Sequence, residues 1–157
     1  VGSEMCIRDR GKLSAIVTQN IDGLHQAAGS KNVFELHGSV HRNYCQKCGK
    51  FFDVNYVVNA KGVPYCDECG GIIKPDVVLY EEGLDSQTIN GAVRAISKAD
   101  MLIIGGTSLV VYPAAGMIDY FKGKYLAVLN RDATSRDKQA DLCITDPIGE
   151  VLGRIRV

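Results

Sequence analysis

Four cysteines in two closely spaced pairs constrain the fold of this chain more than any other feature. The pattern is Cys45-x2-Cys48, seventeen further residues, then Cys66-x2-Cys69, and a glycine follows each pair. Two tight turns that each present two thiolates can face one another and close a tetrahedron around one Zn²⁺. Protein ligands then fill the whole coordination sphere, so we predict a structural zinc ribbon. Two disulfides or four unrelated thiols are the alternatives, and the spacing and a reducing compartment favour the metal.

The composition indicates a globular protein whose partner is neutral or a small molecule. Of the 157 residues, 46% are hydrophobic, which suffices for one core and a small appended module. Lys plus Arg (18) equals Asp plus Glu (18), so no overall field attracts nucleic acid or an anionic membrane. No apolar run approaches the roughly 20 residues of a membrane span. We therefore expect a cytoplasmic protein with no nucleic-acid or membrane partner.

The first ten residues, VGSEMCIRDR, differ from the rest of the chain. They are short, charged and aperiodic, and neither a helix cap nor a turn signal connects them to the first periodic segment. We interpret residues 1–10, including Cys6, as a non-native leader that resembles a translated sequencing adapter. The natural N-terminus is then expected to be missing.

Apolar runs that alternate with amphipathic segments predict an α/β fold with a parallel, doubly wound sheet. The predicted strands are residues 13–17, 32–36, 76–80, 101–104, 125–129 and 141–145. The predicted helices are residues 23–28, 53–59 and 86–98, one that starts near Pro113, and one opened by Asp146 and Pro147. The zinc ribbon, residues 41–75, is expected to be inserted into a main domain formed by residues 11–40 and 76–157.

Polar side chains follow several of the predicted strands, where open α/β sheets bind ligands. His37 follows the strand at 32–36 and has Gly38 beside it, and imidazole is well suited to accept a proton near neutral pH. We therefore predict that His37 is a general base. His25 and His41 are expected to be structural.

Glycine and hydroxyl residues follow the strand at 101–104. Gly105 and Gly106 let the backbone approach a ligand, and Thr107 and Ser108 can bind a ribose or phosphate. The full G-x-G-x-x-G pattern is absent, and such turns are common without ligands. Asn130, after the next strand, suits a ribose hydroxyl, although asparagine there is commonly a turn former.

These segments occur in one order that resembles a sirtuin. The matching segments are residues 18–25 (TQNIDGLH), residues 35–39 (ELHGS), the four ribbon cysteines, residues 74–78 (KPDVV), residues 106–109 (GTSL) and residues 130–132 (NRD). The resemblance extends from Leu13 to the C-terminus, and an ordered set of motifs is more specific than any single one.

The resemblance implies an NAD-dependent protein lysine deacylase with a Rossmann-like domain, a structural zinc and a cleft for acyl-lysine peptides between the two parts. In such enzymes the acyl oxygen attacks the nicotinamide ribose, nicotinamide leaves, and a histidine, here His37, activates a ribose hydroxyl. The products are free lysine, nicotinamide and acyl-ADP-ribose. By resemblance, NAD is bound by Gln19, Asn20, Asp22, Gly106, Thr107, Ser108, Asn130, Arg131 and Cys143. Val78, Leu79 and Tyr80 would pair with the substrate peptide as an added strand.

Two departures from the family pattern affect these expectations. The glycine-rich N-terminal segment that opens the Rossmann domain and cradles the NAD phosphates is absent. We therefore expect a fragment that lacks the first strand of its sheet and much of its cofactor affinity. Residues 79–82 read LYEE where many relatives carry two aromatic residues and Gly-Glu, which leaves the acyl preference open.

Three other functions remain open. A zinc-ribbon binding module is one, but four lysines and three acids between Cys45 and Lys74 are too balanced for a surface that tracks phosphates. Mono-ADP-ribosyl transfer on the same scaffold is the second. An inert truncated chain is the third.

Overall fold

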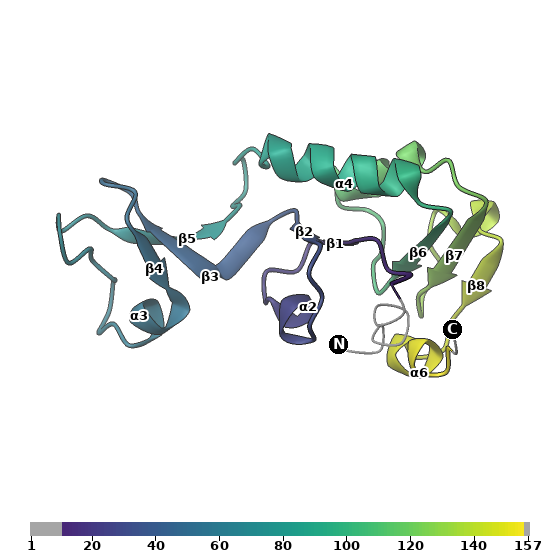
Figure 1. Ribbon diagram of the computed structural model, residues 1–157, viewed down its shortest axis with the longest axis horizontal. Coiled ribbons are helices and arrows are strands. Elements are labelled where there is room, and N and C mark those ends of the chain that lie inside the picture. Colours follow the sequence, from purple (N-terminus) through teal and green to yellow (C-terminus); the bar gives the residue numbers. More distant parts are fainter. Residues whose placement is uncertain (1–10, 156–157) are drawn as a thin grey trace.

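The structure is a computed structural model that describes residues 11–155, so the predicted leader with Cys6 lies outside the described residues. Figure 1 shows an elongated molecule with the zinc-ribbon part at one end and, at the other, a sheet covered by a long helix. The strands are β1 (Ile16–Thr18), β2 (Val33–Glu35), β3 (Gly38–Cys45), β4 (Phe51–Asp53), β5 (Ile73–Val77), β6 (Met101–Gly105), β7 (Tyr125–Leu129) and β8 (Leu142–Ile144). The α-helices are α2 (Leu24–Ala27), α3 (Val54–Val58), α4 (Ser86–Lys98), α5 (Ala114–Met117) and α6 (Ile148–Gly153). Two short 3-10 turns are η1 (Ile118–Tyr120) and η2 (Asp137–Gln139).

The parallel sheet of the main part forms two pieces among the described residues. β1 pairs with β2, and β6, β7 and β8 form a second sheet in that order; all of these pairings are parallel. β7 is buried at four of its five positions, which explains its almost continuous apolar sequence. The α/β fold class is therefore confirmed.

Helix α4 connects the two pieces of parallel sheet, and its bounds match the predicted ones. Asp85 caps it by accepting a hydrogen bond from the backbone N–H of Thr88 at 2.7 Å. The apolar stripe of α4 includes the buried residues Ala92 and Ile96, and their cluster contains Leu36 with Phe34 of β2 and Leu102 of β6 packed against it. One core beneath α4 thus holds both pieces together (Figure 1).

The zinc-ribbon part contains an antiparallel sheet in the order β4-β3-β5. Its small core consists of Cys45, Phe52, Cys66 and Ile73. Asp53 caps α3 by accepting a hydrogen bond from the backbone N–H of Tyr56 at 2.9 Å. Helix α3 lies within the predicted helix at 53–59. No helix in the described range 11–155 has the length and apolar character that crossing a membrane demands.

The predicted strand at residues 76–80 is wrong. The strand is β5, Ile73–Val77, and it pairs antiparallel with β3 in the small sheet instead of extending the parallel one. The apolar run at 77–80 suggested a buried strand, but the chain leaves the sheet after Val77 and turns at Tyr80. Pro75 fits this placement because proline is tolerated in an edge strand such as β5.

Strand β3 was missing from the predicted elements because two of its three buried positions are polar. Ser39 and Asn43 are each only 1% exposed, so hydropathy alternation does not reveal the strand. The register against β5 shifts between these two residues, which makes residues 40–42 a bulge, called the β3 bulge below. The Asn43 side-chain amide donates to the Val40 carbonyl at 3.1 Å and stabilises the bulge.

Candidate active site and metal centre

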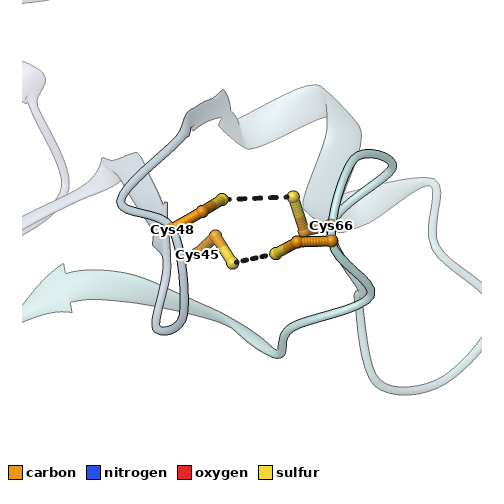
Figure 2. Close-up of side chains that lie close together, drawn as sticks. Cys45, Cys48 and Cys66 are labelled. Carbon is orange, nitrogen blue, oxygen red and sulfur yellow. Dashed lines mark hydrogen bonds between the residues drawn. The ribbon is translucent and has the colours of Figure 1, made fainter.

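The four ribbon cysteines form one cluster whose sulfur atoms all lie within 4.8 Å of one another. The two cysteine turns, residues 45–49 and 66–70, are called knuckles below, and Figure 2 shows that they face each other. The Sγ–Sγ distance is 3.4 Å for Cys45 and Cys69 and 3.7 Å for Cys48 and Cys66. A tetrahedron with Zn–S bonds of about 2.3 Å has edges of about 3.8 Å, so the cluster has the right size for zinc. Four thiols without a carboxylate or histidine are the donors of a structural site.

Backbone groups shape the two knuckles and favour the thiolate of Cys45, whereas neighbouring thiols raise the pKa of Cys48 and Cys69. Gly49 and Gly70 have left-handed φ angles of 75° and 67°, and each donates its N–H back to the first cysteine of its pair. The backbone N–H of Cys48 is the largest influence on Cys45 and lowers the pKa of its thiol to about 6. The Cys45 thiolate, the form that binds metal, is therefore favoured near neutral pH.

Lys50 links the two knuckles from outside the cluster. Its ammonium lies 2.8 Å from the Asp67 carboxylate and 2.9 Å from the Glu68 carboxylate, both of which belong to the second knuckle. The hydrogen bonds that Lys50 donates to Asp67 and then to Glu68 raise the pKa of Lys50 above its ordinary value. The same ammonium stands 5.5 Å from the Phe52 ring centroid, over the small core. Lys50 therefore holds together the two halves that the metal would bridge.

His37 is held by a backbone carbonyl that follows β1. Its Nδ1 atom lies 3.2 Å from the carbonyl oxygen of Gln19. A carbonyl only accepts hydrogen bonds, so Nδ1 carries the proton in the neutral ring and Nε2 is left as the basic nitrogen. The strand ends bring these two residues together because Thr18 of β1 pairs with Glu35 of β2.

Gly38 allows the chain to turn directly behind His37. Its φ is 77°, and a Cβ there would lie 1.8 Å from the Asp76 carbonyl oxygen. The backbone of β5 thus approaches the strand so closely that only glycine fits. Beyond β5, the N–H of Val78 donates to the His37 carbonyl at 3.1 Å, which fixes the backbone on both sides of the imidazole.

Three of the residues expected to bind NAD, Gln19, Asn20 and Asp22, lie in the loop between β1 and α2. The side-chain nitrogen of Gln19 is buried and has no partner in the described structure, so a ligand polar group could satisfy it. Asn20 and Asp22 are exposed, and Asp22 accepts from the Leu24 N–H at 3.0 Å. The N-cap of α2 is Gly23.

The second group of predicted residues lies at the carboxyl ends of β6, β7 and β8, which the strand register aligns. Gly106, with a φ of 63°, donates its N–H to Leu129, and a Cβ at this glycine would meet nothing within 4 Å. Open space over a left-handed glycine suits the close approach of a phosphate or ribose. The Thr107 hydroxyl accepts from the Leu109 N–H at 3.2 Å, and Ser108 is exposed.

Three further predicted residues of this group differ in what they can offer a ligand. The Asn130 side chain donates to the Asp132 carbonyl at 2.8 Å. This is the turn-forming role that the sequence left open beside binding of a ribose hydroxyl. Arg131 is exposed beside it. Cys143 is exposed in β8, and its thiol contacts the Asp137 carbonyl at 3.6 Å.

The residues predicted to pair with a peptide do not form a strand by themselves. Val78 is bonded to His37 through its N–H, whereas Leu79 and Tyr80 are exposed and lie in the turn that follows β5. Glu82 closes this turn by accepting from the Leu79 N–H at 2.8 Å and pairing with Lys74 at 2.9 Å. The segment is thus anchored at both ends and open between them.

One ion-pair network next to the site was not predicted. Arg42 of β3 bonds to Glu35 of β2 at 2.7 Å and to Asp76 of β5 at 2.8 Å. The Glu35 side chain is only 7% exposed. These residues come from three strands separated in the sequence, and no local pattern indicates their contact.

The comparisons with known proteins identify the family. The model described as Sir2 family matches residues 5–113. The chain is 67% identical over 147 residues to an NAD-dependent protein deacetylase of Clostridium acetobutylicum and covers 60% of it; 93% of this chain is aligned. A protein of the same name from Clostridium perfringens is 65% identical over 150 residues, with 95% of this chain and 62% of the relative covered.

Solved structures give the same result. A structure of Sir2 with a p53 peptide and NAD⁺ superposes with a TM-score of 0.88 at 36% identity, covering 98% of this chain and 66% of that one. A structure of Sir2 bound to acetylated peptide has a TM-score of 0.87 at 36% identity, with 98% of this chain and 67% of the other covered. The chain spans about 60% of the length of the curated relatives it matches. From its motifs, its fold and these matches, the chain belongs to the Sir2 family, the sirtuins.

Proposed function

We propose that the protein is an NAD-dependent protein lysine deacylase that converts an acyl-lysine peptide and NAD into free lysine, nicotinamide and acyl-ADP-ribose. The observation that carries the proposal is the contact of His37 Nδ1 with the Gln19 carbonyl at 3.2 Å. It leaves Nε2 of His37 free to act as a base beside the loop that carries Gln19, Asn20 and Asp22.

Bound NAD would supply an electrophilic ribose carbon whose bond to nicotinamide breaks as the acyl oxygen attacks. His37 then takes a proton from a ribose hydroxyl through Nε2. Gln19, whose side-chain nitrogen is buried without a partner, would donate to the cofactor. Asn20 and Asp22 would line the nicotinamide pocket. Gly106, Thr107, Ser108, Asn130, Arg131 and Cys143 would contact the adenosine side.

The peptide would be held between the two parts of the chain. Val78, Leu79 and Tyr80 leave β5 with exposed side chains at the last two positions, which suits pairing with an extended peptide. The zinc ribbon, residues 41–75, would form one wall, and residues 11–40 and 76–157 would form the NAD-binding domain. Zinc would be structural, because four cysteine ligands leave no open coordination position. A cytoplasmic location suits the four reduced thiols.

Nicotinamide release from NAD and an acetyl-lysine peptide tests the proposal. The 157-residue chain and the full-length protein are assayed separately, with the Clostridium acetobutylicum deacetylase as the positive control. We expect release by the full-length protein, with deacetylated peptide and acetyl-ADP-ribose formed in equal amounts. Full-length protein that folds, binds zinc and releases nothing would contradict the proposal.

Mass spectrometry of the peptide separates the alternative reactions. Mono-ADP-ribosyl transfer would add ADP-ribose to the peptide and leave its acetyl group in place. A binding module would give neither product. Activity confined to the full-length protein would identify the short chain as inert by itself.

A further inference from the structure

The β3 bulge (residues 40–42) contacts the loop that the proposed function assigns to nicotinamide. The Val40 N–H donates to the Ile21 carbonyl at 3.1 Å. The Nε2 atom of His41 lies 2.9 Å from the Asp22 carbonyl oxygen. Since that oxygen only accepts, Nε2 of His41 is the donor. Two successive residues of β3 therefore hold two successive carbonyl groups of the loop.

The His41 ring also packs directly against Gly23. Gly23 has a φ of 67°, and a Cβ there would lie 2.7 Å from Cδ2 and 2.9 Å from Nε2 of His41. No larger residue could occupy this position without displacing the ring. The loop at 19–23 and the His41 side chain therefore fit each other through both a hydrogen bond and direct packing.

The strand that carries His41 is fixed on both sides. The His41 N–H donates to the buried Ser39 hydroxyl at 3.2 Å. Arg42 binds Glu35 and Asp76, and thereby joins β3 to strands of both parts of the chain. β3 then continues to Cys45, the first cysteine of the metal cluster. The metal end of the chain and the loop at 19–23 are thus connected by one strand.

Resting on the proposed function, we propose that His41 is a positioning residue for the nicotinamide pocket. It acts through the backbone carbonyl of Asp22 and touches no reacting atom. The Nε2–H of His41 holds residues 20–23 in the conformation in which Asn20 and Asp22 face nicotinamide. The sequence indicated only a structural role for His41, because its partner is a backbone atom nineteen positions away.

Two variants separate the hydrogen bond from the ring. His41→Phe keeps a flat ring against Gly23 and loses the donor, whereas His41→Gln keeps a donor near the position of Nε2 and loses the ring. Tyr44→Phe is the matched control, because it changes one polar atom on the same strand. Amide hydrogen exchange of Val40 and Leu24, whose N–H groups bond within this region, reports on the loop without any ligand.

We expect both amides to exchange about fivefold faster in His41→Phe, the size expected for one lost hydrogen bond, and at wild-type rates in His41→Gln and Tyr44→Phe. Unchanged exchange in His41→Phe would overturn the proposal. Equal acceleration in His41→Gln, or acceleration that spreads to the buried amide of Val128 in β7, would also overturn it, because either result indicates a general loss of stability.

Steady-state kinetics of the full-length protein then test the functional part. His41→Phe should raise the KM for NAD and the inhibition constant of nicotinamide by about fivefold, and leave the KM for the peptide unchanged. Faster exchange with an unchanged KM for NAD would overturn the positioning role. If the wild-type protein releases no nicotinamide, the proposed function fails, whereas the exchange experiment still decides whether His41 holds the loop.

Discussion

The imidazole of His37 donates its Nδ1–H to the backbone carbonyl of Gln19, 3.2 Å away. This contact joins the end of β2 to the end of β1 and orients the ring in the main part of the chain. A carbonyl oxygen can only accept a hydrogen bond, so the neutral ring carries its proton on Nδ1. Nε2 is then left as the hydrogen-bond acceptor. The proposed base therefore has a backbone carbonyl as its Nδ1 partner.

The first prediction concerns that base. His37→Ala should reduce formation of deacetylated peptide by the full-length protein by about 10²- to 10⁴-fold, the usual contribution of a general base. Affinity for NAD, measured by calorimetry, should change little. His25→Ala is the matched control, because His25 lies on α2 outside the proposed machinery. Near-normal turnover by His37→Ala would contradict the assignment.

The second prediction concerns the metal. A strong chelator should remove one zinc ion per chain and unfold β3, β4 and β5 as far as the β3 bulge, while α4 and the β6–β8 sheet stay folded, because each part has its own core. Hydrogen exchange followed by mass spectrometry measures this segment by segment. Cys66→Ser should behave like the chelated chain. Cys143→Ser should bind zinc normally, and retained protection of β4 after chelation would contradict the prediction.

The third prediction concerns the bridge between the knuckles. Lys50→Gln removes the ammonium that contacts Asp67 and Glu68, so zinc should transfer to a chromogenic chelator about two to five times faster. High salt should weaken this difference, since exposed ion pairs are screened. Lys47→Gln provides the comparison from the same knuckle. Equal transfer rates for the two variants at low salt would show that Lys50 has no such role.

The fourth prediction compares two glycines with nearly equal φ angles, 77° at Gly38 and 75° at Gly49. Alanine at Gly49 meets nothing within 4 Å and should cost only the left-handed conformation, about 1–2 kcal/mol. Alanine at Gly38 would also place Cβ 1.8 Å from the Asp76 carbonyl oxygen, so its cost should be clearly larger. Urea unfolding measures both free energies. Similar values would mean that β5 can move away from Gly38 freely.

The fifth prediction concerns pH and the cap of α4. The N–H and then the hydroxyl of Thr88 bond to the Asp85 carboxylate and hold its pKa below the ordinary value. A lowered folded-state pKa stabilises the protein above the unfolded pKa of about 3.9, and this stabilisation disappears as the pH falls through the folded value.

Asp85→Asn keeps a capping oxygen without the titratable charge. At pH 7 its Tm should be about 2 °C below that of the wild type, and the difference should vanish once the pH falls below the folded-state pKa of Asp85. Acid releases zinc from the wild type and from Asp85→Asn alike, so only the difference between their Tm values is interpreted. A difference that stays constant from pH 7 to pH 3 would exclude the charge of Asp85 as its source.

The sequence by itself determined the elements whose signals are local. The spacing of the four cysteines predicted a cluster of the size that zinc requires. The apolar positions of α4 and the nearly continuous apolar run of β7 gave their bounds without error, because their side chains face one core at a regular period. The order of polar motifs identified the family for the same reason: it lies entirely along the chain.

Only the tertiary structure decided the contacts between distant segments. Buried Ser39 and Asn43 concealed β3, and the apolar run after Asp76 suggested a strand where the chain leaves the sheet. The bonds of His37 to Gln19 and of His41 to Asp22 end on backbone carbonyls, which every residue possesses. A side-chain pattern cannot indicate which carbonyl is used, because strand pairing and the β3 bulge place it there.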